Sequence, residues 1–438
     1  MASFRHLALV SLVAMSLPLV SALAVETGVW SLDTSKLGLA ELQRLESHPG
    51  VLDFAEMGNT LLVVAETATQ PPFSGLPVTA ARLEGRTGLQ GLTVLLSKYG
   101  GALQFIDGNA SVVAHVGRYF IVEATAPGLN RIRAEEDHNF AAVPLAGRQV
   151  LFRSAAHLAA VAPADPALKP LVDRVDRERY TANLKRLIDF KTRYSYSPNI
   201  HQVAKWGMEA FKALGLEARI DTYGSRKLPN VVAELTGSTR PDDIFVVGGH
   251  MDSIAYDNDT NAPGADDNAS GSAGVLELAH VLAGTHPEAT VRFVLFSGEE
   301  QGLYGSKAYV ELLKKNGELG KVKAMLNLDM IAFDKSAPLQ VMLEGKAVSH
   351  NFSDRLQAHA AAFAPDLEVN RTDNAWGSDH IPFLDRNIPA TLTIEFEYDD
   401  NGQEHSPRDV FEIFNLDLAI DILRMDAGAL CELTGVKP

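Results

Sequence analysis

Three short segments decide the fold of this chain: FVVGGHMDS at 245–253, GADDNASGSAG at 264–274 and VRFVLFSGEEQGLYGS at 291–306. The first and third begin as apolar runs of strand type and end in glycine. Polar residues able to bind a metal follow, namely His250 and Asp252 in one segment and Glu299 and Glu300 in the other. In an open α/β sheet, functional residues gather where strands end and helices begin. The segments therefore predict an α/β fold with a metal site at one edge of its sheet.

The sequence on either side predicts two structural units. Apolar runs predict strands at 230–235, 243–249, 291–297, 324–329, 339–344 and 390–396, with helices between most of them. We therefore expect residues 168–438 to form a mainly parallel mixed sheet between helices. Residues 25–160 predict a small α+β domain without clustered ligands, which we interpret as a propeptide or accessory domain. The Ala- and Pro-rich stretch at 155–170 is typical of a linker between the two.

Composition excludes several classes of function. The chain has 438 residues, of which 46% are hydrophobic and 21% charged, which is typical of a globular protein with a large core. Its net charge of -16 argues against nucleic acid or an anionic membrane as a partner and suits a cationic ligand. Cys431 is the single cysteine, so the chain forms no internal disulfide and has no cysteine-based zinc site.

The first 24 residues have the order of a secretory signal peptide. Arg5 and His6 precede the apolar stretch LALVSLVAMSLPLV, and Ala22-Leu23-Ala24 follows it. A membrane anchor is the alternative, although the stretch is short for a spanning helix. We expect a secreted or periplasmic protein whose mature chain starts near Val25.

Each candidate ligand has a structural alternative. His250 is either a ligand or a buried structural histidine, and Asp252 either binds metal or fixes the ring of His250. Asp266 and Asp267 are equally typical of a helix N-cap, but two adjacent carboxylates repel each other, and a cation would relieve this. One carboxylate can bridge two metals, and we assign that position to Asp266.

The later motifs supply the remaining candidates. Of the pair Glu299 and Glu300, one can bind metal while the other moves a proton, and a surface turn is the alternative. Asp329 closes the apolar run AMLNLD. His405 and His380 compete for the last ligand position.

The motifs GGHMDS, GADDNASG, GEEQGLYGS, NLDM and EHSPRD resemble, in this order, those of the M28 family of zinc aminopeptidases. The resemblance covers about residues 170–438 and implies a fold of the zinc exopeptidase type with two zinc ions. It assigns His250 and Asp329 to one zinc, Glu300 and His405 to the other, Asp266 to the bridge, Glu299 to general base catalysis and Asp252 to the support of His250. It also implies a cis peptide bond between Asp266 and Asp267.

The function implied by this resemblance is a secreted aminopeptidase that removes apolar residues from peptides with a free N-terminus. The candidates for its apolar side-chain pocket are Met330, Ile331, Trp376, Phe383 and Phe396, although core packing is the alternative for most of them. Other functions remain open: a glutaminyl cyclase-like acyltransferase, a non-catalytic binding module, or an M28-type carboxypeptidase. The last would need a cationic clamp, for which the sequence offers Arg371, Arg386 and Arg408.

Overall fold

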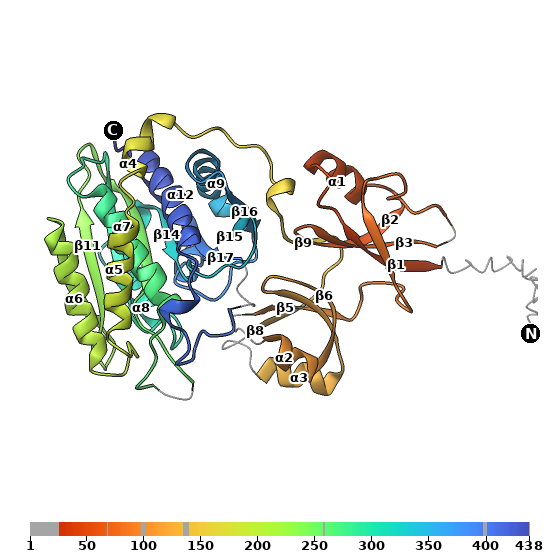
Figure 1. Cartoon of the computed structure of the whole chain (residues 1–438), viewed down its shortest axis with the longest axis horizontal. Coiled ribbons are helices and arrows are strands. Elements are labelled where there is room, and N and C mark those ends of the chain that lie inside the picture. The colour runs from red at the N-terminus through yellow and green to blue at the C-terminus, as the bar shows by residue number, and fades with distance from the viewer. Residues whose placement is uncertain are drawn as a thin grey trace, which may run out of the picture.

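The computed structural model describes residues 26–67, 69–97, 102–134, 140–256, 259–396 and 401–437 (Figure 1). The predicted signal peptide at 1–24 lies outside these residues. Figure 1 shows a large unit of sheet and helices beside two smaller sheets built from the N-terminal third of the chain. Among the described helices, none is long and apolar enough to cross a membrane.

The large unit is organised around an eight-stranded sheet in the order β10-β11-β13-β12-β14-β17-β15-β16. Its strands are β10 (Glu217–Tyr223), β11 (Leu228–Leu235), β12 (Arg240–His250), β13 (Ala289–Phe296), β14 (Val322–Leu328), β15 (Leu339–Glu344), β16 (Leu367–Thr372) and β17 (Ala390–Glu395). The central strands β13, β12, β14 and β17 are mutually parallel. The fold class expected from the sequence is therefore confirmed. The six predicted strands are all present, while β10 and β16 at the two edges were not predicted.

Helices cover both faces of this sheet. They are α4 (Lys169–Val172), α5 (Arg177–Ile188), α6 (Asn199–Ala213), α7 (Gly271–Leu282), α8 (Tyr304–Lys315), α9 (His350–Phe363), α10 (Ile381–Leu384) and α12 (Leu416–Thr434). Alternate residues of β12 enter different cores: Val247 packs with α5, α6, α7, α9 and α12, and Val246 packs with α8 and α10. Because both faces are covered, β13 is buried along its whole length and is apolar except for Thr290 and Arg292.

The N-terminal unit contains two sheets, in which all described strand pairs are antiparallel except that of β2 with β9. One has the order β4-β1-β3-β2-β9, and the other has the order β6-β7-β5-β8. The strands of the first are β1 (Thr27–Asp33), β2 (Val51–Met57), β3 (Thr60–Glu66), β4 (Thr79–Leu83) and β9 (Gln149–Phe152), with helix α1 (Leu39–Glu46). The second contains β5 (Leu92–Ser97), β6 (Ala110–Val116), β7 (Tyr119–Ala124) and β8 (Phe140–Pro144), with α2 (Ala102–Asp107) and α3 (Ala126–Ala134). This arrangement agrees with the α+β class expected for this part of the chain.

The linker leads from β9 to α4 through two single 3₁₀ turns, Ala155–His157 and Pro166–Leu168. Its carbonyl groups are held by α9, since Gln357 Nε2 donates to Ala159 O at 3.1 Å and Arg355 Nη1 donates to Ala162 O at 2.8 Å. The linker therefore runs along the surface of the large unit (Figure 1).

Candidate metal centre

The donor groups converge at the carboxyl ends of the parallel strands. His250 is the last residue of β12, and Asp329 directly follows β14. Glu299 and Glu300 lie in the loop after β13, and Asp267 lies at a non-helical kink within the segment Ala265–Ser270 that leads into α7. His405 completes the set from the loop that precedes α12. The carboxyl ends of neighbouring parallel strands lie at the same edge of a sheet, which explains why segments distant in sequence meet here.

Asp267 lies between the two histidines. Its Oδ1 is 3.1 Å from His250 Nε2, and its Oδ2 is 2.9 Å from His405 Nε2. His250 Nε2 is also 3.2 Å from Asp329 Oδ1, and His405 Nε2 is 3.1 Å from Glu300 Oε2. The two carboxylate oxygens of Asp267 therefore face two separate groups of donors, each made of one histidine and one further carboxylate.

These groups fit zinc. Imidazole nitrogens and carboxylate oxygens are common zinc ligands, and ligand atoms about 2.0–2.2 Å from a tetrahedral ion lie about 3.3 Å from one another. Donor atoms of His250, Glu299 and Asp329 all lie within 4.8 Å of one another, as do those of His250, Asp267 and Glu300. The donor types and their spacing therefore match those of a tetrahedral zinc site.

The electrostatics of the buried histidines and carboxylates also favour a metal site. Burial by itself lowers the pKa of His250, yet the carboxylates of Asp329 and Glu299 prevail and raise it well above its usual value. For His405, burial is likewise outweighed by Glu300 and Asp267, and its pKa is also raised. The site thus holds a buried excess of negative charge, which divalent cations would neutralise.

The assignment of the bridge to Asp266 is wrong, because its carboxylate faces away from both histidines. Asp266 Oδ1 accepts a hydrogen bond from the Ala332 N–H at 3.2 Å, and Oδ2 accepts one from Asn401 Nδ2 at 2.7 Å. Burial raises the pKa of Asp266 to about 7. The expected cis peptide bond is also misplaced by one residue, since it joins Asp267 and Asn268.

The structure brings the other predicted residues together. His250, Asp329, Glu300 and His405 all contact this centre, and their role as ligands stays a prediction. His380, the rival of His405, instead directly precedes the short helix α10.

Asp252 contacts His250 and the backbone of Glu299 on the side of His250 away from Asp267 and Asp329. His250 Nδ1 lies 3.2 Å from the carbonyl oxygen of Asp252 and 3.5 Å from its Oδ1. The same carboxylate accepts hydrogen bonds from Ser195 Oγ at 3.0 Å and from the Glu299 N–H at 3.3 Å. Asp252 therefore ties the orientation of His250 to the backbone that carries Glu299, which agrees with the supporting position predicted for it.

Three further supporting residues were not predicted. Asp409 accepts the N–H groups of Asp266 and Asp267 at 2.8 and 3.0 Å and so holds the turn that presents Asp267. Ser378 Oγ donates to Asp329 Oδ2 at 2.5 Å, and Tyr256 Oη lies 2.8 Å from His405 Nδ1. Ser378 and Asp409 belong to the segments WGSDHIPF and EHSPRD, so their proximity to candidate histidines was a usable signal. Tyr256 carried no such signal.

A cavity of about 580 Å³ opens onto the centre. It is lined by Ile254, Tyr256, Glu299, Glu300, Gln301, Gly302, Leu303, Lys307, Lys346, Ala375, Trp376, Gly377, Ile381 and His405. Of the five apolar candidates named from the sequence, Trp376 lines it. The other four pack in the hydrophobic cores, as the alternative interpretation held.

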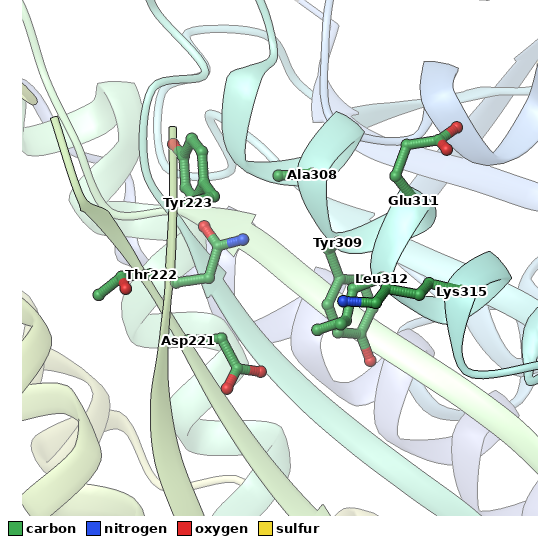
Figure 2. Close-up of a pocket in the computed structure, with 9 residues that line it drawn as sticks. Asp221, Thr222, Tyr223, Ala308, Tyr309, Glu311, Leu312 and Lys315 are labelled. Carbon is green, nitrogen blue, oxygen red and sulfur yellow. The ribbon is translucent and has the colours of Figure 1, made fainter. Parts of the chain in front are cut away.

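A second cavity, of about 260 Å³, is lined by residues of β10 and α8 together with Asn230, and none of the candidate metal donors lines it (Figure 2). Figure 2 shows that the carboxylates of Asp221 and Glu311 do not converge there. Asp221 pairs with Arg219, and Glu311 pairs with Arg386. This cavity therefore does not compete as the functional site.

The comparisons with known proteins agree with this geometry. The model of peptidase family M28 matches residues 230–428. A probable zinc metalloprotease of Pyrenophora teres f. teres is 33% identical over 193 residues, which are 39% of this chain and 40% of that relative. A probable leucine aminopeptidase of Arthroderma otae is 30% identical over 280 residues, which are 60% of this chain and 74% of that relative.

The fold is also that of solved structures. The crystal structure of LapB from Legionella pneumophila superposes with a TM-score of 0.57 at 18% identity, covering 78% of this chain and 99% of that one. The zinc aminopeptidase BSAP from Bacillus subtilis has a TM-score of 0.52 at 15% identity and covers 60% of this chain and 96% of that one. The solved structures show the fold, and the match to the family model together with the Arthroderma otae relative shows that the chain belongs to peptidase family M28.

Proposed function

We propose that this chain hydrolyses the first peptide bond of peptides with a free N-terminus and uses two zinc ions to do so. The observation that carries the proposal is the position of Asp267, whose two oxygens face His250 at 3.1 Å and His405 at 2.9 Å. A single carboxylate shared in this way suits two ions held side by side. His250 and Asp329 would hold one ion and Glu300 and His405 the other.

Zinc bound in such a pair polarises a carbonyl and makes water acidic enough to attack it near neutral pH. The proton of that water has a nearby acceptor in this chain. Glu299 is buried, with 1% of its surface exposed, and its backbone is fixed by Asp252. Its carboxylate would take the proton and deliver it to the nitrogen of the leaving peptide, as a general base and then a general acid.

The surroundings favour an amino terminus over a carboxylate as the recognised end of the peptide. Acidic side chains dominate the centre, and the three arginines considered for a carboxylate clamp do not line the cavity. The two lysines that line it have other partners, Gly302 O for Lys307 at 2.8 Å and Asp385 for Lys346 at 3.6 Å. Arg371 pairs with Asp354 at 2.5 Å, Arg386 pairs with Glu311, and Arg408 Nε donates to Gln403 at 2.8 Å. This supports an aminopeptidase rather than a carboxypeptidase.

The cavity also supports a preference for an apolar first residue. Ile254, Trp376 and Ile381 line it with apolar surface that a leucine-like side chain would cover. Burying such a side chain stabilises the complex by about 1.5–3 kcal/mol.

The test compares a leucine-initiated peptide with its N-acetylated form, each with and without a zinc chelator, by measuring the free amino acid released. We expect release from the free peptide alone and its loss with chelator. Cleavage of the acetylated peptide, release from the carboxyl end, or conversion of N-terminal glutamine to its cyclic form would contradict the proposal.

A further inference from the structure

The two units of the chain meet through a buried ion pair. Arg118 lies in the turn between β6 and β7 of the N-terminal unit, and Glu344 ends β15 of the large unit. Arg118 Nη1 is 3.2 Å from Glu344 Oε1, and Nη2 donates to Glu344 Oε2 at 3.2 Å. The two side chains are 5% and 0% exposed. An ion pair with one hydrogen bond at this depth fixes the position of the hairpin against the large sheet.

The same guanidinium holds Trp376. Arg118 Nη2 donates to the Trp376 carbonyl oxygen at 3.4 Å, and its central carbon lies 5.9 Å from the centre of the indole ring. The Arg118 guanidinium therefore contacts both the backbone and the ring of Trp376.

A second contact holds the start of the same segment. The Leu151 carbonyl oxygen in β9 accepts hydrogen bonds from Thr372 Oγ1 at 2.6 Å and from Asn374 Nδ2 at 2.7 Å. Residues 372–377 are thus attached to the N-terminal unit at both ends. Their last members, Ala375, Trp376 and Gly377, form one wall of the cavity above the metal donors.

The contact extends into a shared hydrophobic core. Buried side chains of the N-terminal unit, including Tyr119 and Phe152, pack in one cluster with Met330, Met342 and Phe396 of the large unit. Phe152 and Phe396 have ring centres 5.6 Å apart in an edge-to-face arrangement. Removing the N-terminal unit would expose this apolar surface directly beside Asp329.

We propose that Arg118 is a positioning residue: it fixes Trp376, so that the N-terminal unit sets the shape of the pocket that receives the first side chain of the substrate. This rests on the proposed function. Arg118 contributes no atom to the chemistry, and its effect is on substrate binding. The N-terminal unit would then contribute to substrate binding by fixing one wall of the cavity.

The experiment uses the full chain with two variants at the contact. Arg118→Lys keeps the charge opposite Glu344 but lacks the planar fork that reaches Trp376. Arg118→Met combined with Glu344→Gln removes both charges, so no charged group is left buried without its partner. The matched control is Arg82→Met, since Arg82 lies 5.8 Å from the ring centre of Trp30 inside the N-terminal unit, away from the cavity.

We expect both contact variants to keep the zinc content and kcat of the wild type. KM should rise about 5- to 30-fold, which corresponds to a loss of about 1–2 kcal/mol of binding free energy. The rise should be larger for a leucine-initiated than for an alanine-initiated peptide, and Arg82→Met should leave both constants unchanged. Amide hydrogen exchange over residues 372–377 should be faster in the double variant.

Unchanged KM together with unchanged exchange at 372–377 would overturn the positioning role. A fall in kcat and zinc content without a change in KM would also overturn it, because the effect would then lie on Asp329. If the wild type releases no amino acid, the proposed function fails, and the exchange measurement still decides whether Arg118 fixes the Trp376 segment.

Discussion

The hydroxyl of Ser378 donates a hydrogen bond of 2.5 Å to Oδ2 of Asp329, the oxygen that does not face His250. Asn327 Nδ2 donates to the same hydroxyl at 2.8 Å and so fixes its orientation. The carboxylate of Asp329 is therefore held with Oδ1 towards the centre. Ser378 belongs to the segment that follows Trp376, which connects the cavity wall to a candidate metal ligand.

The first prediction concerns this hydrogen bond. Ser378→Ala should weaken zinc binding about 10- to 100-fold, because groups that orient a metal ligand typically contribute that much. Competition with a chromophoric chelator measures the affinity. Ser353→Ala is the control, since Ser353 is also buried and hydrogen-bonded, to Thr391 at 3.1 Å on the α9 side. Equal zinc affinities in the two variants would contradict the orienting role of Ser378.

The second prediction concerns Glu299. Glu299→Gln keeps the shape of the side chain but removes its ability to accept a proton, so kcat should fall about 10²- to 10⁴-fold. Zinc content, measured by elemental analysis, should stay that of the wild type. A variant that turns over at nearly the normal rate would exclude Glu299 as the general base, and one that has lost zinc would make it a ligand instead.

The third prediction concerns pH. Burial raises the pKa of Glu344 from 4.5 to about 7, with Arg118 opposing the shift. Between these two values the folded protein keeps a proton that the unfolded chain has released, so the free energy of unfolding falls as the pH rises and levels off above about 7. The full difference corresponds to about 3 kcal/mol.

Urea unfolding of the wild type and of Glu344→Gln at a series of pH values isolates this effect. The stability of the wild type relative to the variant should decline as the pH rises from about 4.5 to about 7 and then stay constant. A difference that is independent of pH, or that grows with rising pH, would contradict the assignment.

The sequence predicted the centre of the fold better than its edges. Strands such as β13 are mostly apolar because both faces are covered, and a glycine, Gly298, follows soon after the end of β13. The edge strands β10 and β16 were not predicted. In β10, Glu217–Tyr223, polar residues alternate with partly buried ones, since one side of the strand has no neighbour. Such a pattern is also typical of a surface loop.

The sequence predicted which motifs form the site but not which of two adjacent aspartates faces the histidines. Asp266 and Asp267 have the same chemistry and adjacent positions, so the residue type could not decide between them. The deciding contacts come from Ala332 and Asn401, which lie 66 and 135 residues further along the chain. Only the folded structure brings these donors to Asp266 and leaves Asp267 facing the histidines.

The most direct test of the account is therefore the zinc content per chain of three proteins: the wild type, Asp267→Asn and Asp266→Asn. Elemental analysis after gel filtration should give two zinc ions for the wild type and for Asp266→Asn. Asp267→Asn should retain less than one, together with a loss of release of N-terminal leucine, because an amide cannot serve both ions as a carboxylate does. Full zinc content in Asp267→Asn, or loss of zinc in Asp266→Asn alone, would contradict a centre built around Asp267.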